Sequence, residues 1–441
     1  MKAINIFSIA ASTFALVFIF SCNKNSDIKS PLLNPPVIIT RPVTVINSTS
    51  VVSGGEFTNT TTITDKGIIW GTDSSALTVS TINKISNGAA LANFMDTIQV
   101  LQPNTTYYVK AFAVYSTGVS YGAAIKFTTP PTVYTAGYHG TSAAYWKDGK
   151  LFPLAGGTYA HSIYVVGNDV YVAGENNNGN LQAVYWKNGV PVMLSNGTNA
   201  ALANSIYVVG TDVYVGGYEL YNNNAISPVA KYWKNGVAVS LTDAPDYNGI
   251  ISSVYVVGND VYAAGWKARV PGGYQVATYW KNGIAVHLND STTTIASAQS
   301  IFVKGNDVYV CGKEQSQNGV FGGIPVAKYW KNGIAVSLTD GLQFAGANSI
   351  FVNGGDVYTS GYEYSGVTGY SVAKYWKNGV PTSLTDGTKY GNAYSIYSVG
   401  SDVYVAGGEG DYFNAMCWKN GVSLPIDINA QYSRSVSIFV Q

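Results

Sequence analysis

Glutamates at one position of a repeated segment are the residues of this 441-residue chain whose type and spacing best suit chemistry. The segment, of which Val170–Gly174 is an example, occurs seven times and ends in glycine each time. In four of the seven copies a glutamate stands two residues after that glycine. Aromatic residues directly precede some of these positions. Carboxylates beside aromatic rings are suited to the hydroxyls and faces of sugars. The candidate ligand-binding residues are therefore Tyr218, Glu219, Trp266, Glu314, Tyr362, Glu363 and Glu409, with an ordinary role as solvated loop residues as the open alternative.

Signals for catalysis, metals and cofactors are poor. A carboxylate pair for glycoside hydrolysis could be assembled from the same glutamates, but nothing in their spacing selects one. We interpret His287 as incidental, because it replaces a serine of the repeat such as Ser240. The sequence contains no G-x-S-x-G, no H-E-x-x-H and no glycine-rich phosphate loop before a helix. We therefore predict no catalytic residue, no metal site and no cofactor.

The composition excludes further classes of function. Lys plus Arg number 25 and Asp plus Glu number 24, which gives a net charge of +1. A nucleic-acid binder would need a clustered positive excess, so no nucleic-acid partner is expected. Charged residues make up only 11% of the chain, whereas Gly (48) and Tyr (34) are abundant. Frequent turn residues together with aromatic β-formers indicate an all-β protein.

A long repeat must position the candidate residues. Each unit predicts four short strands, of which Ser205–Val209 is an example of the first and Val170–Gly174 of the second. The third strand carries Tyr-Trp-Lys, and an Asn-Gly turn, such as Asn188-Gly189, leads to the fourth. Four-stranded units of this length are typical of β-propeller blades. The tryptophans that mark the units are Trp146, Trp186, Trp233, Trp280, Trp330, Trp376 and Trp418.

The two ends of the repeat region predict a closed ring. The first unit lacks its first strand and begins with the second, at Thr132–Gly137. The missing strand appears at the far end of the chain, as Ser437–Val440. Pairing the two fragments removes an exposed sheet edge, which an open array would not require. Six complete units and one split unit then form a seven-bladed β-propeller over residues 132–441.

Repeated side chains are expected to hold the blades together. The adjacent Tyr and Trp of the third strand point to opposite faces, so both faces are buried between blades. The lysine after each Trp should face the aspartate that begins the second strand, as Lys187 faces Asp169. A serine such as Ser205 opens each first strand, and we expect its hydroxyl to satisfy backbone groups, with a ligand at the channel mouth as the alternative. Cys311 and Cys417 lie in different units and are predicted to be buried free thiols.

The units differ most at one rim of the ring. The segments between the second and third strands vary in length, as do the connections between units, whereas the turns at the other rim are nearly constant. Divergence confined to one rim of a rigid scaffold is what a binding surface would show. Drift in unconstrained loops would give the same pattern and stays open as the alternative.

Residues 1–22 have the pattern of an export signal, with Lys2 followed by an apolar run that ends in Ile-Phe-Ser before Cys22. This end resembles a bacterial lipobox, and the resemblance implies that Cys22 becomes the lipidated first residue of the mature protein. An uncleaved membrane anchor is the alternative. Asn23 follows the cysteine where an Asp would suggest the inner membrane, so the outer membrane or cell surface is favoured. Residues 23–35 are polar and predict a flexible tether.

Residues 36–129 alternate in the manner of β-strands. The stretch Leu101–Ala111 resembles the L-x-P-x-T-x-Y-x-V-x-A signature of fibronectin type III domains. The resemblance implies an immunoglobulin-like sandwich in which Tyr107 is the tyrosine corner and Trp70 is a core aromatic. We expect this domain to be a spacer between the lipid anchor and the propeller.

The repeat itself resembles bacterial extracellular repeats of the HAF type, which share a W-x-N-G hairpin. Together the patterns predict an all-β protein, anchored to the membrane by its lipid, whose propeller rim binds a glycan or a protein ligand. A carbohydrate-active hydrolase or lyase that uses the rim carboxylates is the alternative. A purely structural envelope lipoprotein is the third reading.

Overall fold

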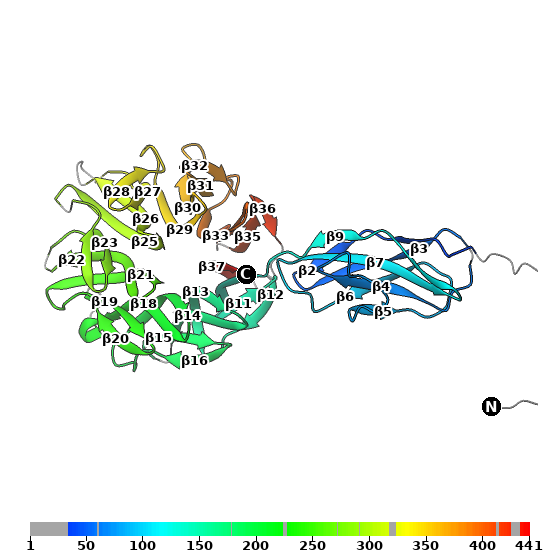
Figure 1. The fold of residues 1–441 in the computed structure, drawn as a ribbon. Helices are drawn as coiled ribbons and strands as arrows, with labels where there is room; N and C mark the ends of the chain where they lie inside the picture. The colour runs from blue at the N-terminus through cyan, green and yellow to red at the C-terminus, as the bar shows by residue number, and fades with distance from the viewer. Residues whose placement is uncertain are drawn as a thin grey trace, which may run out of the picture. The chain divides into compact units, whose positions relative to one another are not determined.

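The computed structural model describes residues 34–59, 61–177, 179–223, 227–270, 272–290, 292–316, 323–411, 414–424 and 433–441. The expected export signal with Cys22, and the tether except for its last two residues, lie outside this part of the chain. The described residues form strands almost throughout (Figure 1). No helix among them is long and apolar enough to cross a membrane.

The N-terminal part consists of two β-sheets. The first sheet pairs β1 (Ile38–Thr40), β3 (Ser50–Phe57), β2 (Thr44–Asn47) and β6 (Phe94–Ile98). The second sheet pairs β5 (Lys84–Ser86), β4 (Asp65–Gly71), β7 (Thr106–Tyr115), β8 (Gly118–Tyr121) and β9 (Ile125–Thr128).

Contacts in this part match the expected tyrosine corner and correct the expected core. The backbone N–H of Gln102 donates to the Tyr107 hydroxyl at 3.0 Å, which ties the start of β7 back to the preceding turn. Trp70 is only half-buried, whereas Ile69 and Phe112 are fully buried and pack together. Trp70 is therefore not the buried core aromatic that the resemblance implies.

Seven four-stranded sheets, which we call ring sheets 1 to 7, follow from residue 133 onward (Figure 1). The first four consist of β37 (Ser433–Val440), β10 (Val133–His139), β11 (Ser142–Lys147) and β12 (Lys150–Pro153); β13 (Gly157–Val166), β14 (Asp169–Asn177), β15 (Leu181–Lys187) and β16 (Val190–Met193); β17 (Ala201–Val209), β18 (Asp212–Leu220), β19 (Pro228–Lys234) and β20 (Val237–Ser240); and β21 (Tyr247–Val257), β22 (Asp260–Arg269), β23 (Val276–Lys281) and β24 (Ile284–His287). The last three consist of β25 (Thr294–Lys304), β26 (Asp307–Ser316), β27 (Val326–Lys331) and β28 (Ile334–Ser337); β29 (Ala345–Asn353), β30 (Asp356–Tyr364), β31 (Ser371–Lys377) and β32 (Val380–Ser383); and β33 (Gly391–Val399), β34 (Asp402–Glu409), β35 (Asn414–Lys419) and β36 (Val422–Leu424). A single 3₁₀ turn among the described residues, η1 (Tyr221–Asn223), follows β18.

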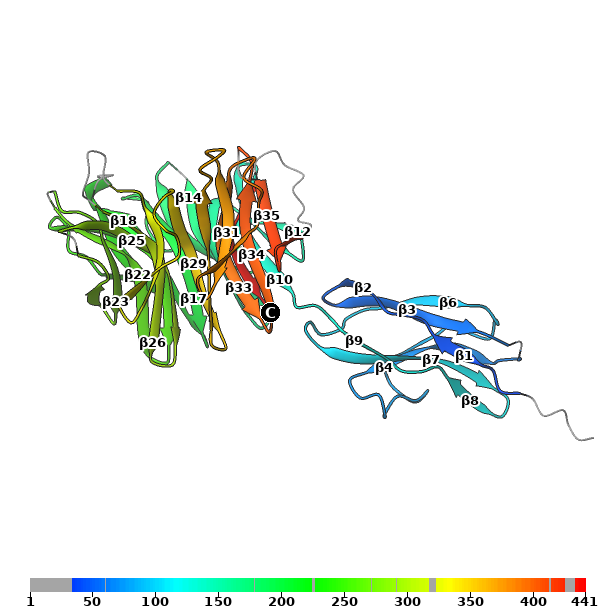
Figure 2. The same cartoon turned by 90° about the horizontal axis from the view of Figure 1, so that it is seen from above.

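The ring sheets are arranged in a circle, which is the architecture of a β-propeller (Figure 1). Figure 2 shows the same ring sheets from the side. The C-terminal strand β37 completes ring sheet 1, as the sequence predicts. It pairs antiparallel with β10, with Val440 opposite Val133 and Ile438 opposite Thr135. Thr132 and Gln441 extend this ladder through two backbone hydrogen bonds, of 2.7 and 3.0 Å. The first and last strands of the repeat region therefore share one sheet.

Both faces of each ring sheet are used in packing, because adjacent residues of a strand point to opposite faces. Trp233 of β19 packs against Tyr171 and Ala173 of the preceding ring sheet. Burying one tryptophan removes roughly 150–250 Å² from water, which stabilises the ring by at most about 4–6 kcal/mol at 25 cal/mol per Å². All seven repeat tryptophans are at most 2% exposed, namely Trp146, Trp186, Trp233, Trp280, Trp330, Trp376 and Trp418.

Serine hydroxyls join the innermost strands into a continuous circle. The Ser162 hydroxyl accepts the backbone N–H of Ile206 in the next ring sheet at 3.2 Å. The same contact recurs at every junction, at 3.0–3.3 Å, and the Ser437 hydroxyl closes the circle onto Ile163. The hydroxyls thus satisfy backbone groups, in agreement with the first of the two expectations for them. The seven acceptors are Ser162, Ser205, Ser253, Ser300, Ser349, Ser395 and Ser437.

A β-bulge next to each serine explains the glycine that closes each second strand. In ring sheet 3 the register shifts between Ala203 and Ser205, so that Asn204 is the extra residue. The bulge brings the Leu202 carbonyl oxygen to 1.9 Å from where a Cβ on Gly217 would lie. Only glycine fits there. The corresponding glycines of the other sheets are equally crowded, at 1.7–2.2 Å.

Seven aromatic rings form a second closed circle at the centre. Each innermost strand contributes one ring, and neighbouring centroids lie 4.4–5.3 Å apart. The tilted and edge-on angles are those that aromatic pairs prefer. Burial raises the pKa of the Tyr164 and Tyr207 hydroxyls well above their usual range. The rings belong to Tyr164, Tyr207, Tyr255, Phe302, Phe351, Tyr397 and Phe439.

Candidate functional site

The candidate residues lie at one end of the second strand in ring sheets 3 to 7, and hence at a single rim. Tyr218 and Glu219 belong to β18, and Trp266 belongs to β22. Because these strands continue beyond the bulge glycine, the residues are strand residues rather than loop residues, which corrects the expectation that they are loop residues. The others are Glu314 in β26, Tyr362 and Glu363 in β30, and Glu409 in β34.

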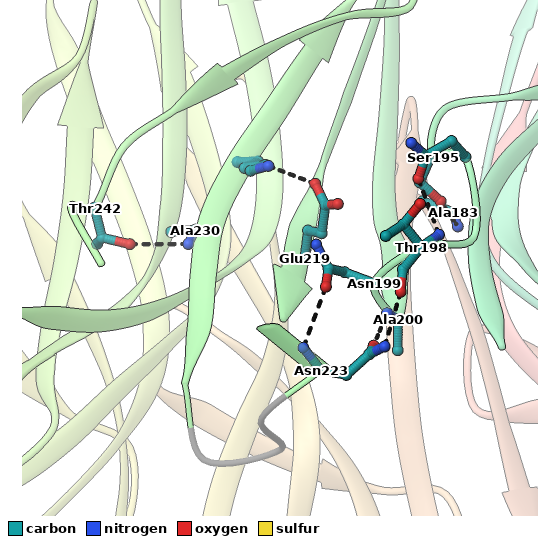
Figure 3. Close-up of polar contacts among 11 residues, drawn as sticks. Ala183, Ser195, Thr198, Asn199, Ala200, Glu219, Asn223, Ala230 and Thr242 are labelled. Atoms are coloured by element: carbon teal, nitrogen blue, oxygen red, sulfur yellow. Dashed lines mark hydrogen bonds and ion pairs between the residues drawn. The ribbon is translucent and has the colours of Figure 1, made fainter. Parts of the chain in front are cut away.

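Three of the glutamates form ion pairs with a lysine of the third strand. Glu219 pairs with Lys231 (Figure 3). Glu314 pairs with Lys328 at 2.8 Å and Glu363 with Lys374 at 2.6 Å. All six side chains are only 16–19% exposed, so each charge is neutralised where water has little access.

The Glu219 ion pair lies beside the hydrogen-bonded connection between ring sheets 2 and 3 (Figure 3). The Asn223 amide donates to the Thr198 carbonyl at 2.8 Å, and its oxygen accepts the Ala200 N–H at 2.8 Å. The Thr242 hydroxyl accepts the Ala230 N–H at 3.0 Å on the other side. These contacts make the walls of a pocket of about 400 Å³, which is lined by Asn199, Glu219, Tyr221, Lys231, Ser240 and Asp243 among others.

The aromatic candidates are half-buried and partly used in packing. Tyr218 lies opposite the fully buried Ala230, and burial raises the pKa of its hydroxyl. Tyr362 lies opposite Gly346 and packs edge-on against Tyr364 at 6.1 Å. Trp266 is half-buried between Ile250 and Ala277 of the neighbouring strands. Each ring offers only part of its surface to a ligand.

Ring sheet 4 departs from its neighbours at this rim. Where ring sheets 3, 5 and 6 have Glu, Lys and Ser on one face, ring sheet 4 has Lys267, Thr278 and His287. The hydroxyl of Thr278 lies 3.1 Å from His287 Nδ1. Burial and then the charge of Lys267 lower the pKa of His287. His287 therefore belongs to a distinct polar site. Comparing the three register positions together across the repeat would have revealed it.

A second polar contact was missed by sequence reasoning. Glu175 is 7% exposed in its side chain and lies 3.5 Å from His161 Nε2. His161 is the extra residue of the bulge in ring sheet 2, and its ring stacks on Tyr159 at 6.4 Å. A bulge inserts an extra residue that interrupts the alternation of the strand. The alternation of the sequence therefore could not show which side chains His161 would contact.

The repeated Asp–Lys pairs at the opposite rim are present as the sequence predicts. Lys187 contacts Asp169 at 2.9 Å, and its hydrogen bond holds the pKa of Asp169 below the usual range. The Asn188 amide also bonds Asp169, at 2.8 Å. The remaining pairs, at 2.7–2.9 Å, are Lys234–Asp212, Lys281–Asp260, Lys331–Asp307, Lys377–Asp356 and Lys419–Asp402.

Chemistry by thiols or metals finds little support in the described part of the chain. Cys311 and Cys417 are buried free cysteines, as predicted, and burial raises the pKa of the Cys417 thiol to about 12. A thiol held in its neutral form is a poor nucleophile and a poor ligand. No group of three or more His, Cys, Asp or Glu among the described residues could hold a metal ion.

Comparisons with known proteins find similarity to solved structures only. No family model matches the chain, and no curated protein matches its sequence. A structure described as the β-propeller domain of the Trilobed protease from Pyrococcus furiosus is 9% identical, covers 89% of this chain and 96% of its own, and has a TM-score of 0.37. Pyrococcus horikoshii acylaminoacyl peptidase is 10% identical, with 92% and 65% coverage and a TM-score of 0.34. A DUF4784 family protein from Bacteroides caccae is 10% identical, with 91% and 98% coverage and a TM-score of 0.29.

Proposed function

We propose that this chain is a lipid-anchored bacterial surface protein whose seven-bladed β-propeller binds a glycan at the rim that carries Glu219 and Lys267. Cys22 would carry the lipid, at the outer membrane or cell surface. A fibronectin type III-like domain would be the spacer, and the Gln102–Tyr107 hydrogen bond supports that assignment.

One observation carries the proposal: side-chain variation is concentrated at this rim while the framework contacts repeat around the ring. The serine circle is the same at every junction. At the varying rim, the face that carries Glu219 and Lys231 in ring sheet 3 carries Lys267 and Thr278 in ring sheet 4. A fixed backbone that presents different polar groups at equivalent positions is suited to recognition.

The hydrolase or lyase alternative is less well supported. A general acid and a base or nucleophile must be free to exchange protons with a substrate. Glu219, Glu314 and Glu363 are each held by a lysine ammonium and are mostly buried. These three carboxylates therefore act as structural ion pairs.

A glycan-array screen tests the proposal. The chain is produced from residue 23 onward, without the expected export signal and without Cys22, and is applied to neutral and acidic oligosaccharides. We expect selective binding without turnover. Turnover of a bound sugar that is lost in Glu314→Gln or Glu363→Gln would instead establish the hydrolase or lyase. Absence of binding to every glycan would contradict the proposal and favour the structural reading or a protein ligand.

A further inference from the structure

A pocket of about 520 Å³ opens at the rim of ring sheet 4. This size lies within the usual range for small-molecule sites. Its lining combines aromatic rings with charged groups from one sheet and the connections next to it. The residues that matter here are Tyr247, Lys267, Arg269, Tyr274, His287 and Asp290.

Strand geometry brings the cationic residues to one face. Lys267 and Arg269 are two positions apart on β22 and therefore point the same way. Tyr247 lies directly opposite Arg269 on β21. The Lys267 ammonium lies over the Tyr247 ring, 3.9 Å from its centroid. The cation–π contact orients the lysine without neutralising its charge.

The neighbouring sheets show what is unusual about this charge. In ring sheets 3, 5 and 6 the position of Lys267 holds a glutamate that pairs with a lysine. Ring sheet 4 has the opposite sign there and a threonine in place of that lysine. Among the described residues, neither Lys267 nor Arg269 forms an ion pair. With neutral His287, the charged residues that line this pocket are Lys267, Arg269 and Asp290, which give a net charge of +1. The pocket beside Glu219 in ring sheet 3 has a net charge of −1, from Glu219, Asp243 and Lys231.

Asp290 is occupied within its own turn. One of its carboxylate oxygens accepts the Thr292 backbone N–H at 2.9 Å and the Thr292 hydroxyl at 2.8 Å. Asn289 is fixed as well, because its oxygen accepts the Ala277 N–H at 2.8 Å and its amide donates to Thr294. The wall of the pocket is therefore built before any ligand arrives, and its two cations remain available.

His287 offers a directed hydrogen-bond acceptor. The Thr278 hydroxyl donates its one proton to the Val276 carbonyl at 2.9 Å. The imidazole must then donate the hydrogen bond from its Nδ1–H to the Thr278 hydroxyl oxygen, 3.1 Å away. In the neutral ring this leaves Nε2 as an acceptor, which suits a hydroxyl group. Tyr274 adds an aromatic surface that is 52% exposed.

We propose that this pocket binds an acidic sugar residue, with its carboxylate or sulfate on Lys267 and Arg269 and a hydroxyl on His287. Arginine recognises both anions through paired hydrogen bonds. The exposed face of Tyr274 is suited to the apolar face of the sugar ring. The inference rests on the proposed glycan-binding function and names the class of glycan.

Calorimetric titration of the chain from residue 23 onward, without the expected export signal and Cys22, tests this inference. The probes are an oligogalacturonate for the carboxylate, a κ-carrageenan oligosaccharide for the sulfate, and a neutral xylo-oligosaccharide. The test variant is Lys267→Glu with Thr278→Lys, which gives ring sheet 4 the ion pair of its neighbours. The control is Lys304→Gln at the opposite rim, which changes the net charge by the same one unit.

We expect the double variant to fold like the parent chain and to bind the acidic probe at least tenfold more weakly, with the control unchanged. Arg269→Gln changes a single exposed residue and should also weaken binding of the acidic probe. It serves as the test if the double variant folds poorly. Unchanged affinity in both variants would overturn the inference. If the neutral xylo-oligosaccharide binds as tightly as the acidic probes and the variants do not change its affinity, the inference of an acidic sugar is wrong. The proposed glycan binding would then still stand. Equal or tighter binding of a poly-glutamate peptide of matched charge would show that the pocket reads charge rather than sugar, which also overturns the inference.

Discussion

The serine at each junction is a small residue with a large structural role. Its hydroxyl accepts a backbone N–H of the next sheet, as the Ser205 hydroxyl accepts the N–H of Val254 beside the bulge of ring sheet 4. A buried donor left without an acceptor is destabilising by about 1–3 kcal/mol. The framework therefore depends on seven hydroxyls, in the role that the repeat predicts for them.

We expect Ser205→Ala to lower the free energy of unfolding by about 1–3 kcal/mol, because the Val254 N–H then has no acceptor. Urea unfolding measured by fluorescence would report the change. The exposed Ser240 provides the matched control, and Ser240→Ala should leave stability almost unchanged. Equal effects of the two substitutions would argue against the hydroxyl circle.

The imidazole of His287 should titrate below its ordinary pKa of 6.5, because burial and Lys267 disfavour its charged form. The unfolded chain then binds the proton more readily than the folded chain. Acid therefore favours the unfolded chain, and neutral His287 contributes to the stability of the folded chain. This contribution is complete above pH 6.5 and is lost as the pH falls through the pKa of the folded state.

NMR titration of the three histidines can measure this pKa directly. We expect Lys267→Glu to raise the pKa of His287, since it removes the nearby positive charge and adds a negative one. In unfolding experiments, the parent chain should lose more stability on acidification than His287→Ser. A pKa at or above the ordinary value in the parent chain would contradict the described environment.

At the scale of strands, the bulge and the closing glycine form one unit. A Cβ on Gly217 would lie 1.9 Å from the Leu202 carbonyl oxygen. The backbone must shift to relieve that contact, and the shift would also move Ser205 away from its partner. The glycine is thus required by close approach of two strands rather than by an unusual φ.

Gly217→Ala should therefore lower the free energy of unfolding by about 3 kcal/mol, the upper end of ordinary single substitutions. Gly355 is a suitable control, because a Cβ there would meet nothing within 4 Å. Differential scanning calorimetry of both variants would show a large fall in Tm for the first and almost none for the second. Similar Tm values would show that the bulge is free to adapt.

Much of the fold could be predicted from local rules. Asn-Gly turns and strand alternation located the strands, and antiparallel pairing predicted the contact of Lys187 with Asp169, although the register places Tyr171 opposite the lysine. The glutamates were expected in loops because the glycine was taken to end the strand, whereas the ladder continues past it to Glu219. The pocket of ring sheet 4 escaped prediction because its residues come from strands and turns that only the register brings together.

At the scale of the whole molecule, the proposed lipid anchor rests on residues 1–22, which end in Cys22. We expect Cys22→Ser to abolish acylation of the protein in its bacterium, since the thiol that would carry the acyl chains is removed. Labelling with a palmitate analogue should mark the parent chain but not the variant. Equal labelling of the two would contradict lipid anchoring at Cys22 and favour an uncleaved apolar segment.

Ring closure is the condition on which the rim depends, because an open array would not hold the sheets at fixed angles. The last strand supplies a full ladder to β10, one serine of the hydroxyl circle and one ring of the aromatic circle. All three are lost together if this strand is removed.

The most direct measurement is the thermal unfolding of a chain that lacks residues 435–441. Closure by β37 predicts a large fall in Tm, or failure to fold, because one edge of ring sheet 1 and the side of the next sheet become exposed. Replacing Gln441 alone with Ala, as a control, should change little. A Tm equal to that of the parent chain would show that the tail is dispensable, and the closed ring that supports the rim would be wrong.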